Sequence, residues 1–372
     1  MMMSLFKPFL HDRFLHLLIV LGVMLACFVP FRLTELPQAV DWPTMIILCG
    51  LLMLTKGIEA SGYFDMLGRR LLQRFENQRH LALFLVSAAA LLSTFLTNDV
   101  ALFIVVPLTL SLRKYSSLPI ARLIIFEALA VNAGSLLTPI GNPQNILLWR
   151  HGTSGFGAFI WQMMPLALWL FFSLLILTAC CFSARKIKRH SPQNETPWQR
   201  RLLFICALLY VLFIITLELD IALWGLMLVL ATWLVLARRL LLSIDWCLLA
   251  VFIVMFIDVF LFSRLPLVQS WLPTVNQLPE SGQFLLAAGL SQVMSNVPAT
   301  ILLLGNQPPS VLLAWAVNIG GFGLLPGSLA NLIALRMAQG NCIWWSFHYY
   351  SLPVLGWSLL SGWGLYVLIH RI

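Results

Sequence analysis

Residues 135–145 read SLLTPIGNPQN, and they lie within a long apolar part of the chain. Two prolines, a glycine and two asparagines separate the apolar runs of residues 123–137 and 146–149. Proline interrupts an α-helix because its ring clashes with the preceding turn and because it has no N–H to donate. Inside a bilayer, non-helical backbone is tolerated only where it is buried in protein or lines a water-filled cavity. The stretch therefore predicts a helix that is broken deep within a membrane protein.

The composition supports a membrane location. Of the 372 residues, 60% are hydrophobic and 10% are charged, and the mean hydropathy is +0.91. An ordinary soluble domain has about 25% charged residues. A membrane-spanning helix needs about 20 mostly apolar residues, and the chain offers many such segments separated by short charged loops. We therefore predict an all-α polytopic membrane protein without a separate soluble domain.

The net charge of +9 follows the loops. Lys and Arg gather at the ends of the apolar segments, which is typical of cytoplasmic loops under the positive-inside rule. This pattern indicates topology and argues against a nucleic-acid partner, which would require a basic groove. A cytoplasmic N-terminus and an outside C-terminus leave four basic residues on the outer side: Arg32, Arg150, Arg264 and Arg371.

Apolar segments occur along the whole chain, at residues 14–31, 43–60, 81–112, 120–149, 158–183, 202–217, 219–237, 246–263, 282–305, 310–338 and 350–370. The segment 81–112 has basic residues on both flanks, so both of its ends favour the cytoplasm. It is therefore predicted to be a re-entrant hairpin whose tip lies near TND at 97–99. The segment 282–305, with SNVP at 295–298, is predicted to be a second hairpin. The prediction is nine full spans and two hairpins.

The two halves of the chain resemble each other. A shift of 198 residues aligns the hairpins and pairs Ala89, Ala90, Ser93, Asn98 and Ala101 with Ala287, Ala288, Ser291, Asn296 and Ala299. A shift of 186 residues aligns the broken segments and pairs Val131, Asn132, Gly134, Gly141 and Asn145 with Val317, Asn318, Gly320, Gly327 and Asn331. Matches among Asn and Gly are rare by chance in so apolar a chain.

These matches predict two inverted-topology repeats, as in many secondary transporters. The first repeat covers residues 1–190, a connecting loop and helix cover 191–218, and the second repeat covers 219–372. The single connecting helix reverses the direction of the second repeat. Residues 14–31 also resemble a signal peptide, but they are interpreted as a span because 219–237 is their counterpart.

Four polar stretches are the candidate binding site for a substrate or ion. At a helix break, N-terminal ends of half-helices favour anions and exposed carbonyls favour cations. Glycine allows close approach of the backbone, and Asn, Ser and Thr supply neutral donors and acceptors. The candidate residues are Thr97, Asn98 and Asp99 at one tip, Ser295 and Asn296 at the other, Asn132, Gly134, Thr138, Pro139, Gly141, Asn142 and Asn145 at the first break, and Asn318, Gly320, Gly321, Gly327, Ser328 and Asn331 at the second. Any one of these motifs alone could be a capping turn at the membrane surface, but four stretches paired by repeat favour binding.

The intramembrane carboxylates are candidates for coupling to H⁺ or Na⁺, because a carboxylate within a bilayer is costly and usually functional. Asp99 is the first candidate, with a cap of the second hairpin helix as the alternative role. Asp258, within an apolar span, is the second candidate. Glu59 and Glu127 are expected to lie close enough to a membrane face to be solvated.

Other classes of chemistry lack their motifs in this sequence. The seven histidines form no ligand constellation, and the seven cysteines have no paired ligand spacing. There is no phosphate-binding loop and no Ser-His-Asp arrangement. We therefore expect no metal site, no cofactor and no enzymatic activity.

At TND, NAGSLLTPIGNPQN, SNVP and VNIGGFGLLPGS the chain resembles the ion transporter superfamily, in particular its arsenite permease, citrate–metal permease and sodium/proton antiporter branches. The resemblance covers nearly the whole chain. It implies a scaffold that often dimerises and a mobile part that moves in an elevator-like fashion. Carried over by position, it implies one half-site at Thr97, Asn98, Asn132 and Thr138 to Asn142, and another at Ser295, Asn296, Asn318 and Gly320.

Two departures from the family pattern bear on the substrate and the coupling ion. The second break, GFGLLPGSLAN, lacks the threonine of the first, and Val297 stands where the first hairpin has Asp99. These departures put a carboxylate-binding site and the number of coupling ions in question.

The expected function is ion-coupled secondary transport of a small anion across the bacterial inner membrane. The anion would be an organic acid such as citrate or a dicarboxylate, or a metalloid oxyanion such as arsenite. The expected partners are this substrate, H⁺ or Na⁺, the lipid bilayer and a second copy of the chain. The alternatives are a Na⁺/H⁺ antiporter and, in a different class, a non-transporting membrane assembly protein or an intramembrane enzyme.

Overall fold

The computed structural model describes residues 9–189, 198–219, 221–338 and 343–370, and the regular elements in these ranges are helices. Six of the described helices are long and apolar enough to cross a membrane. They are α4 (Trp42–Ala60), α6 (Gln78–Phe95), α10 (Phe156–Cys181), α11 (Arg200–Glu218), α14 (Trp246–Ser263) and α20 (Ile343–His370). The prediction of an all-α polytopic membrane protein is confirmed.

The chain forms two compact units, and each takes residues from both halves of the sequence. Unit 1 consists of Met1–Met66 and Asn194–Trp271. Unit 2 consists of Leu67–Gln193 and Leu272–Ile372. Both predicted hairpins and both predicted broken helices therefore belong to unit 2.

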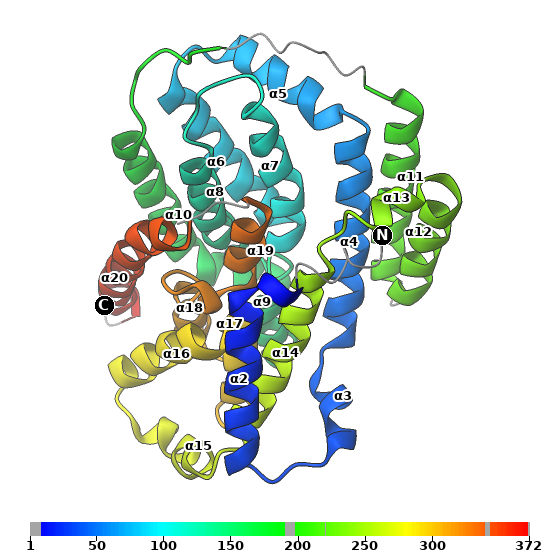
Figure 1. Cartoon of the computed structure of the whole chain (residues 1–372). Coiled ribbons are helices and arrows are strands. Elements are labelled where there is room, and N and C mark those ends of the chain that lie inside the picture. The colour runs from blue at the N-terminus through cyan, green and yellow to red at the C-terminus, as the bar shows by residue number, and fades with distance from the viewer. Residues whose placement is uncertain (1–8, 190–197, 220, 339–342, 371–372) are drawn as a thin grey trace. The chain divides into compact units, whose positions relative to one another are not determined.

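Unit 1 is built mainly from long helices, three of which begin at an aspartate. Helix α14 packs against α2 (Arg13–Phe28) and α4, whereas α11 and α12 (Ala222–Leu236) pack against each other and against α4 (Figure 1). Asp12, Asp41 and Asp245 cap α2, α4 and α14 by accepting a backbone N–H three residues ahead. An N-cap carboxylate satisfies one of the free N–H groups of the first turn. The short elements of this unit are η1 (Leu33–Glu35), α3 (Leu36–Ala39), α13 (Arg238–Leu241) and α15 (Pro266–Trp271).

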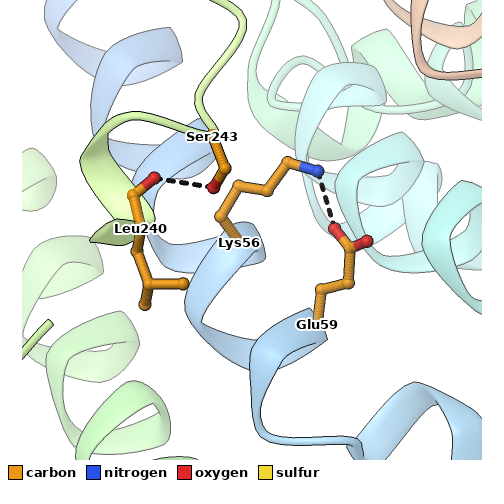
Figure 2. A network of polar contacts seen from close by, with 4 residues as sticks. All are labelled: Lys56, Glu59, Leu240 and Ser243. Carbon is orange, nitrogen blue, oxygen red and sulfur yellow. Dashed lines mark hydrogen bonds and ion pairs between the residues drawn. The ribbon is translucent and has the colours of Figure 1, made fainter. Parts of the chain in front are cut away.

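The C-terminal end of α4 is polar and solvated. Lys56 Nζ donates to Glu59 Oε2 at 2.8 Å, and close by Ser243 Oγ donates to the Leu240 carbonyl at 2.7 Å (Figure 2). The Glu59 side chain is 54% exposed. The expectation that Glu59 is solvated is confirmed.

Unit 2 contains the first hairpin, α6 followed by α7 (Asn98–Leu112). Its two ends pair with one segment of the chain. Asn77 forms a bridge with Lys186, and Ser116 forms one with Arg189. Because both ends lie against the same short segment, α6 and α7 enter and leave on one side of the unit. This geometry is that of the predicted hairpin.

The second hairpin consists of α16 (Glu280–Met294) and α17 (Asn296–Leu304). It follows η2 (Leu272–Gln277), and its ends also lie together. Asn276 Nδ2, just before α16, donates to the carbonyl of Asn306, just after α17, at 2.8 Å. The breaks between the helices fall at 96–97 and at Ser295, where the polar tips were predicted.

The two broken helices of unit 2 are α8 (Ile120–Ser135) with α9 (Pro143–His151), and α18 (Val311–Ile319) with α19 (Leu329–Ala338). Residues 136–142 separate the first pair, and residues 320–328, with η3 (Leu325–Gly327), separate the second. Helix α8 packs against α6, α7 and α19, and α18 packs against α16 and α20. The SLLTPIGNPQN stretch is therefore a helix break buried within unit 2.

Two features differ from the sequence prediction. The charged stretch before the first hairpin forms an amphipathic helix, α5 (Tyr63–Arg74), where a loop was expected. Its Asp65 lies in the first turn and Arg74 in the last, which suits the helix dipole. Helix α20 begins at Ile343 instead of residue 350, with Trp344 and Trp345 in its first turn.

Candidate functional site

Four asparagines from the two broken helices form two hydrogen-bonded pairs within unit 2. Asn132 Nδ2 donates to Asn331 Oδ1 at 2.8 Å, and Asn318 Nδ2 donates to Asn145 Oδ1 at 2.7 Å. All four side chains are buried. We call these four residues the asparagine cluster. Each pair joins one break to the other, so the cluster holds together segments that are more than 170 residues apart.

Further polar groups from the breaks bond to this cluster. Asn318 Oδ1 accepts from Asn142 Nδ2 at 3.0 Å and from Gln144 Nε2 at 3.3 Å. Asn132 Oδ1 accepts from Ser328 Oγ at 3.0 Å. A hydrogen-bonded polar network in a low-dielectric interior favours one arrangement of the groups that it joins. The cluster therefore fixes how the two breaks meet.

The asparagines also replace helical hydrogen bonds that the breaks remove. Asn145 Nδ2 lies within hydrogen-bonding distance of the carbonyls of Ser135, Leu136 and Thr138, at 3.3, 3.1 and 3.0 Å. Asn142 caps α9 by accepting from the backbone N–H of Asn145 at 2.9 Å, and Pro143 occupies the first position of α9. The second break uses Asn331 Nδ2, which donates to the Gly321 carbonyl at 2.9 Å. Buried backbone carbonyls thus find partners where the helices stop.

Each hairpin contacts its broken helix through a polar side chain that the sequence reasoning missed. Thr94 Oγ1 donates to the Gly134 carbonyl at 3.1 Å, and Gln292 Nε2 donates to the Gly320 carbonyl at 2.6 Å. Thr94 and Gln292 are 198 residues apart, which is the shift that aligns the hairpins. A comparison of polar positions at that shift, without requiring identity, would have found both.

Gly134 and Gly320 permit this close approach. A Cβ at Gly134 would overlap the Ala90 carbonyl, and a Cβ at Gly320 would overlap the Ser291 side chain. Glycine is required here because the hairpin helix lies directly against the backbone of the broken helix.

The tip of the first hairpin touches the first break. The Asn98 backbone N–H donates to the Gly141 carbonyl at 2.9 Å. Thr97 is the N-cap of α7, since its Oγ1 accepts from Val100 N at 3.4 Å. Asp99 lies in the first turn of α7 and is buried, and none of the described residues donates to its Oδ1. The capping role considered for Asp99 thus belongs to Thr97.

The second tip has a strained backbone. Ser295 adopts φ 73° and ψ 155°, and its Oγ donates to Asn296 Oδ1 at 3.3 Å. A non-glycine residue rarely adopts this region, at a cost of about 1–3 kcal/mol. Asn296 Nδ2 lies 3.4 Å from the position that a Cβ on Gly321 would occupy. The second tip therefore reaches the second break.

Among the described residues, Asp99 Oδ1 at the first tip and Gln144 Oε1 at the first break are buried oxygens without a hydrogen-bond donor. Asp99 lies in the first turn of α7, and Gln144 in the first turn of α9. Leaving a buried acceptor unpaired costs about 1–3 kcal/mol, and such groups call for an explanation. A cation or a proton would supply the missing partner of Asp99, and a cation or a hydrogen-bond donor would supply that of Gln144.

The remaining predicted residues are less central. Thr138 Oγ1 donates to the Thr94 carbonyl at 2.7 Å, which ties the break to α6. Pro139 is buried in the first break, and Gly327 lies against the Gly320 carbonyl. Asp258 lies in unit 1, buried on α14 with neither carboxylate oxygen hydrogen-bonded. It is thus not part of the asparagine cluster.

Glu127 differs from its prediction. The sequence reasoning placed it near a solvated face, but its side chain is 0% exposed and its carboxylate accepts from Thr109 Oγ1. The prediction was wrong because α8 is surrounded by α6, α7, α10, α19 and α20. These helices bury every residue of α8 from Leu123 onward, including Glu127.

A metal-binding cluster is not found among the described residues: no three of their His, Cys, Asp and Glu side chains gather. The chemical character of the site in unit 2 is therefore that of neutral amides, hydroxyls and backbone groups with one buried carboxyl at a helix start.

Comparison with known proteins relates this architecture to transporters. The profile of the family described as "Citrate transporter" matches residues 1–306. The chain is 57% identical over 366 residues to the inner membrane protein YbiR of Escherichia coli, covering 97% of this chain and 98% of that protein. It is 30% identical over 340 residues to the uncharacterized transporter MJ0456 of Methanocaldococcus jannaschii, covering 89% and 91%.

A more distant match covers part of the chain. The silicon efflux transporter LSI3 of rice is 29% identical over 127 residues, covering 34% of this chain and 26% of that protein. The family and two of these relatives are named as transporters. With a family match over most of its length and two relatives aligned almost end to end, this chain belongs to the citrate transporter family of membrane proteins.

Proposed function

We propose that the chain is an ion-coupled secondary transporter of a small anion and that the asparagine cluster marks its substrate site. The observation that carries this proposal is the meeting of two broken helices through buried amide pairs. Helices α9 and α19 begin at these breaks, and α7 begins at the adjoining tip. Their free N–H groups and positive dipole ends favour a small anion.

The proposed architecture is a pair of inverted repeats with nine full spans and two hairpins. The hydrogen bonds support it. Under the shift of 186 residues, the bond from Asn132 to Asn331 corresponds to that from Asn318 to Asn145. Thr94 donates to the Gly134 carbonyl, and Gln292 donates to the Gly320 carbonyl. These two carbonyls also correspond to each other under the shift of 186 residues. The proposed repeats are residues 1–190 and 219–372, joined by 191–218, with a cytoplasmic N-terminus and a periplasmic C-terminus.

The proposed mechanism is elevator-like alternating access. Unit 2 holds both hairpins and both breaks, so it would be the part that carries the substrate. Unit 1 would be the scaffold and the dimer interface. The relative named as an inner membrane protein supports the bacterial inner membrane as the location. H⁺ or Na⁺ would be the coupling ion, with Asp99 and Asp258 as the candidate carboxylates.

The proposed substrate class is a small organic acid or a metalloid oxyanion. The family description names citrate, and the rice relative is named for silicon efflux. Purified protein should be screened for ligand-induced thermal stabilisation with citrate, dicarboxylates, arsenite, Na⁺ and Li⁺. A ligand that binds only the folded state at 100 times its Kd stabilises that state by about 2.7 kcal/mol, which such a screen detects.

Transport is then measured in proteoliposomes with the stabilising ligand. Asn98→Ala and Asn296→Ala should each reduce transport strongly, whereas Asn306→Ala, an exposed asparagine after α17, should not. Equal transport in all three variants would remove the tips from the site.

A second candidate function is Na⁺/H⁺ antiport, and the unpaired Asp99 Oδ1 favours it. In that case, addition of Na⁺ to proteoliposomes should collapse an imposed pH gradient without any organic substrate. A gradient that decays only when the anion is present would exclude this candidate.

A further inference from the structure

Glu127 is a buried carboxyl that neither the sequence reasoning nor the proposed substrate site uses. Its side chain is 0% exposed, and its Oε2 has no hydrogen-bond partner in the part of the chain that the structure describes. The described residues give the carboxyl one hydrogen-bonding neighbour, the Thr109 hydroxyl on α7. Thr109 is itself fully buried.

An ionised carboxylate in this position would be poorly compensated. Removing a carboxylate from water is costly unless a cation or several donors replace the lost hydration. One hydroxyl provides a single donor, and no ion pair to Glu127 is found in the described ranges. Ca²⁺ and Mg²⁺ take six or more oxygen ligands, and the carboxyl and hydroxyl together provide three. The neutral acid, with its proton on an oxygen of the carboxyl, is therefore the form that these surroundings suit.

The surroundings also allow the ionised form to be reached. Thr109 Oγ1 is placed to donate to the carboxylate once the proton has left. In that step the O–H bond of the acid breaks, the proton passes to water, and both electrons stay on the carboxylate. Glutamine would fill the same space without this capacity, so a purely structural role does not require a glutamate.

The position links this carboxyl to the candidate site. Glu127 precedes Asn132 by five residues on α8, which corresponds to about 7.5 Å along the helix axis. Its partner Thr109 lies on α7, the helix whose first turn contains Asp99. Helices α7 and α8 pack against each other, and both also contact α19, which carries Asn331. A change of charge at Glu127 would therefore act on the helices that meet at the breaks.

We infer that the Glu127–Thr109 pair is a proton-binding site within unit 2, at which Glu127 takes up and releases one proton. This inference rests on the proposed function, because it assigns part of the ion coupling to a residue away from the tips. It adds a titratable site to Asp99 and Asp258.

Other titratable or charged side chains lie on α8 and on the elements packed against it, and their charge also influences the protonation of Glu127. Those that are not exposed are Arg79 on α6, Asp99 on α7, Cys181 on α10, Arg122 on α8 itself, Arg336 on α19, and His348, Tyr350 and Tyr366 on α20. Arg79 and Arg122 donate to the carbonyls of Phe182 and Cys181, at 3.0 and 2.9 Å, and so are engaged at the end of α10.

The direct test is infrared spectroscopy of the full chain in lipid nanodiscs across about pH 4 to 10, a range that brackets the ordinary values of Glu and His. A protonated carboxyl has a C=O band that a carboxylate lacks. We expect Glu127→Gln to remove one such band that, in the wild type, disappears as pH rises. The matched control is Glu76→Gln, whose side chain is 75% exposed and whose loss should leave that band unchanged.

Thr109 variants test the pair without altering the carboxyl. Thr109→Val removes the donor that supports the carboxylate, so the midpoint of the band should move to higher pH by about one unit, a tenfold gain in proton affinity. Thr109→Ser retains the hydroxyl and should restore the wild-type midpoint. Equal midpoints in all three proteins would overturn the role of Thr109.

Transport measurements separate this inference from the proposed function. In proteoliposomes, Glu127→Gln should flatten the pH dependence of transport while ligand-induced thermal stabilisation remains. An unchanged spectrum in Glu127→Gln, or a band that never titrates, would overturn the proton site and leave the transporter proposal intact. If the wild type transports none of the tested ions or acids but the band titrates, the proposed function fails and the proton site stands.

Discussion

The replacement Asn318→Ala tests whether the asparagine cluster holds unit 2 together. Asn318 Nδ2 donates to Asn145 Oδ1 and to the Ala314 carbonyl, at 2.7 and 2.8 Å. Its Oδ1 accepts from Asn142 and Gln144. Truncation therefore removes four hydrogen bonds at once. Asn145 Oδ1 and Gln144 Nε2 lose the partners described for them, whereas Asn142 Nδ2 keeps Ser135.

The expected loss of stability follows from these bonds. Hydrogen bonds within a membrane protein average about 0.6 kcal/mol, so four correspond to about 2.4 kcal/mol. Each buried group that loses its partner, Asn145 Oδ1 and Gln144 Nε2, costs about 1–3 kcal/mol more. With the low end of that range for both groups, the total loss approaches about 4 kcal/mol. For a unit of this size, each kcal/mol shifts the unfolding temperature by about 2–4 °C. The unfolding temperature of Asn318→Ala should therefore fall by about 5–16 °C.

The assay is thermal unfolding of the purified protein in one detergent, followed by tryptophan fluorescence. Asn306→Ala is the matched control, because this asparagine is exposed and its side-chain Nδ2 donates to the Leu302 carbonyl, at 3.2 Å. Its effect should stay within about 2 °C, since exposed substitutions usually change stability by less than about 0.5 kcal/mol. If Asn318→Ala unfolds at the same temperature as Asn306→Ala, the cluster does not stabilise the unit and the reasoning is refuted.

Three further predictions concern single positions. Ser295→Gly should raise the unfolding temperature, because glycine adopts φ 73° without the cost of about 1–3 kcal/mol that serine bears; an unchanged or lower value in thermal unfolding would contradict the strain. Gly134→Ala should lower stability by about 1–3 kcal/mol, because its Cβ would overlap the Ala90 carbonyl; stability equal to wild type in denaturant unfolding would show that α6 can move aside. Arg264 donates to Glu35 at 2.5 Å, and this hydrogen bond lowers the pKa of Glu35. The pair therefore stabilises the folded state at pH values above the unfolded-state pKa of Glu35, and this stabilisation is lost as pH falls through the folded-state pKa. Glu35→Gln should therefore reduce the stability difference between neutral and acid pH, measured by thermal unfolding; an identical difference would show that the pair contributes nothing.

Much of the fold was predictable because its signals are local. The broken helix at residues 136–142 follows from Pro139 and Pro143, because proline has no backbone N–H to donate and its ring clashes with the preceding turn of a helix. The first hairpin follows from basic residues on both flanks of one apolar segment. Helix α5 was missed because its apolar and charged residues alternate irregularly along the sequence. A stretch with so many charged residues, between two apolar segments, is typical of a loop.

The candidate site was predictable only in part. Residue types at the breaks identified Asn132, Asn145, Asn318 and Asn331 as a set, since apolar segments rarely carry asparagine. Their pairing across the breaks could not be derived, because the partners come from segments 173 and 199 residues apart. Gln292 was missed because its counterpart at the first hairpin is a threonine, so that identity between the halves gave no signal.

The sequence by itself determined that this chain is an all-α membrane protein and where its helices break, because hydrocarbon disfavours charge and because prolines clustered with glycine and asparagine interrupt a helix. Tertiary structure alone decided which carboxyls are buried. Asp99 and Glu127 both lie in apolar segments, yet the environment of each depends on what packs around it. Thr97, and not Asp99, is the N-cap of α7, and five helices surround the helix that carries Glu127. Burial of a side chain is set by neighbours that are distant in sequence, and no local pattern records them.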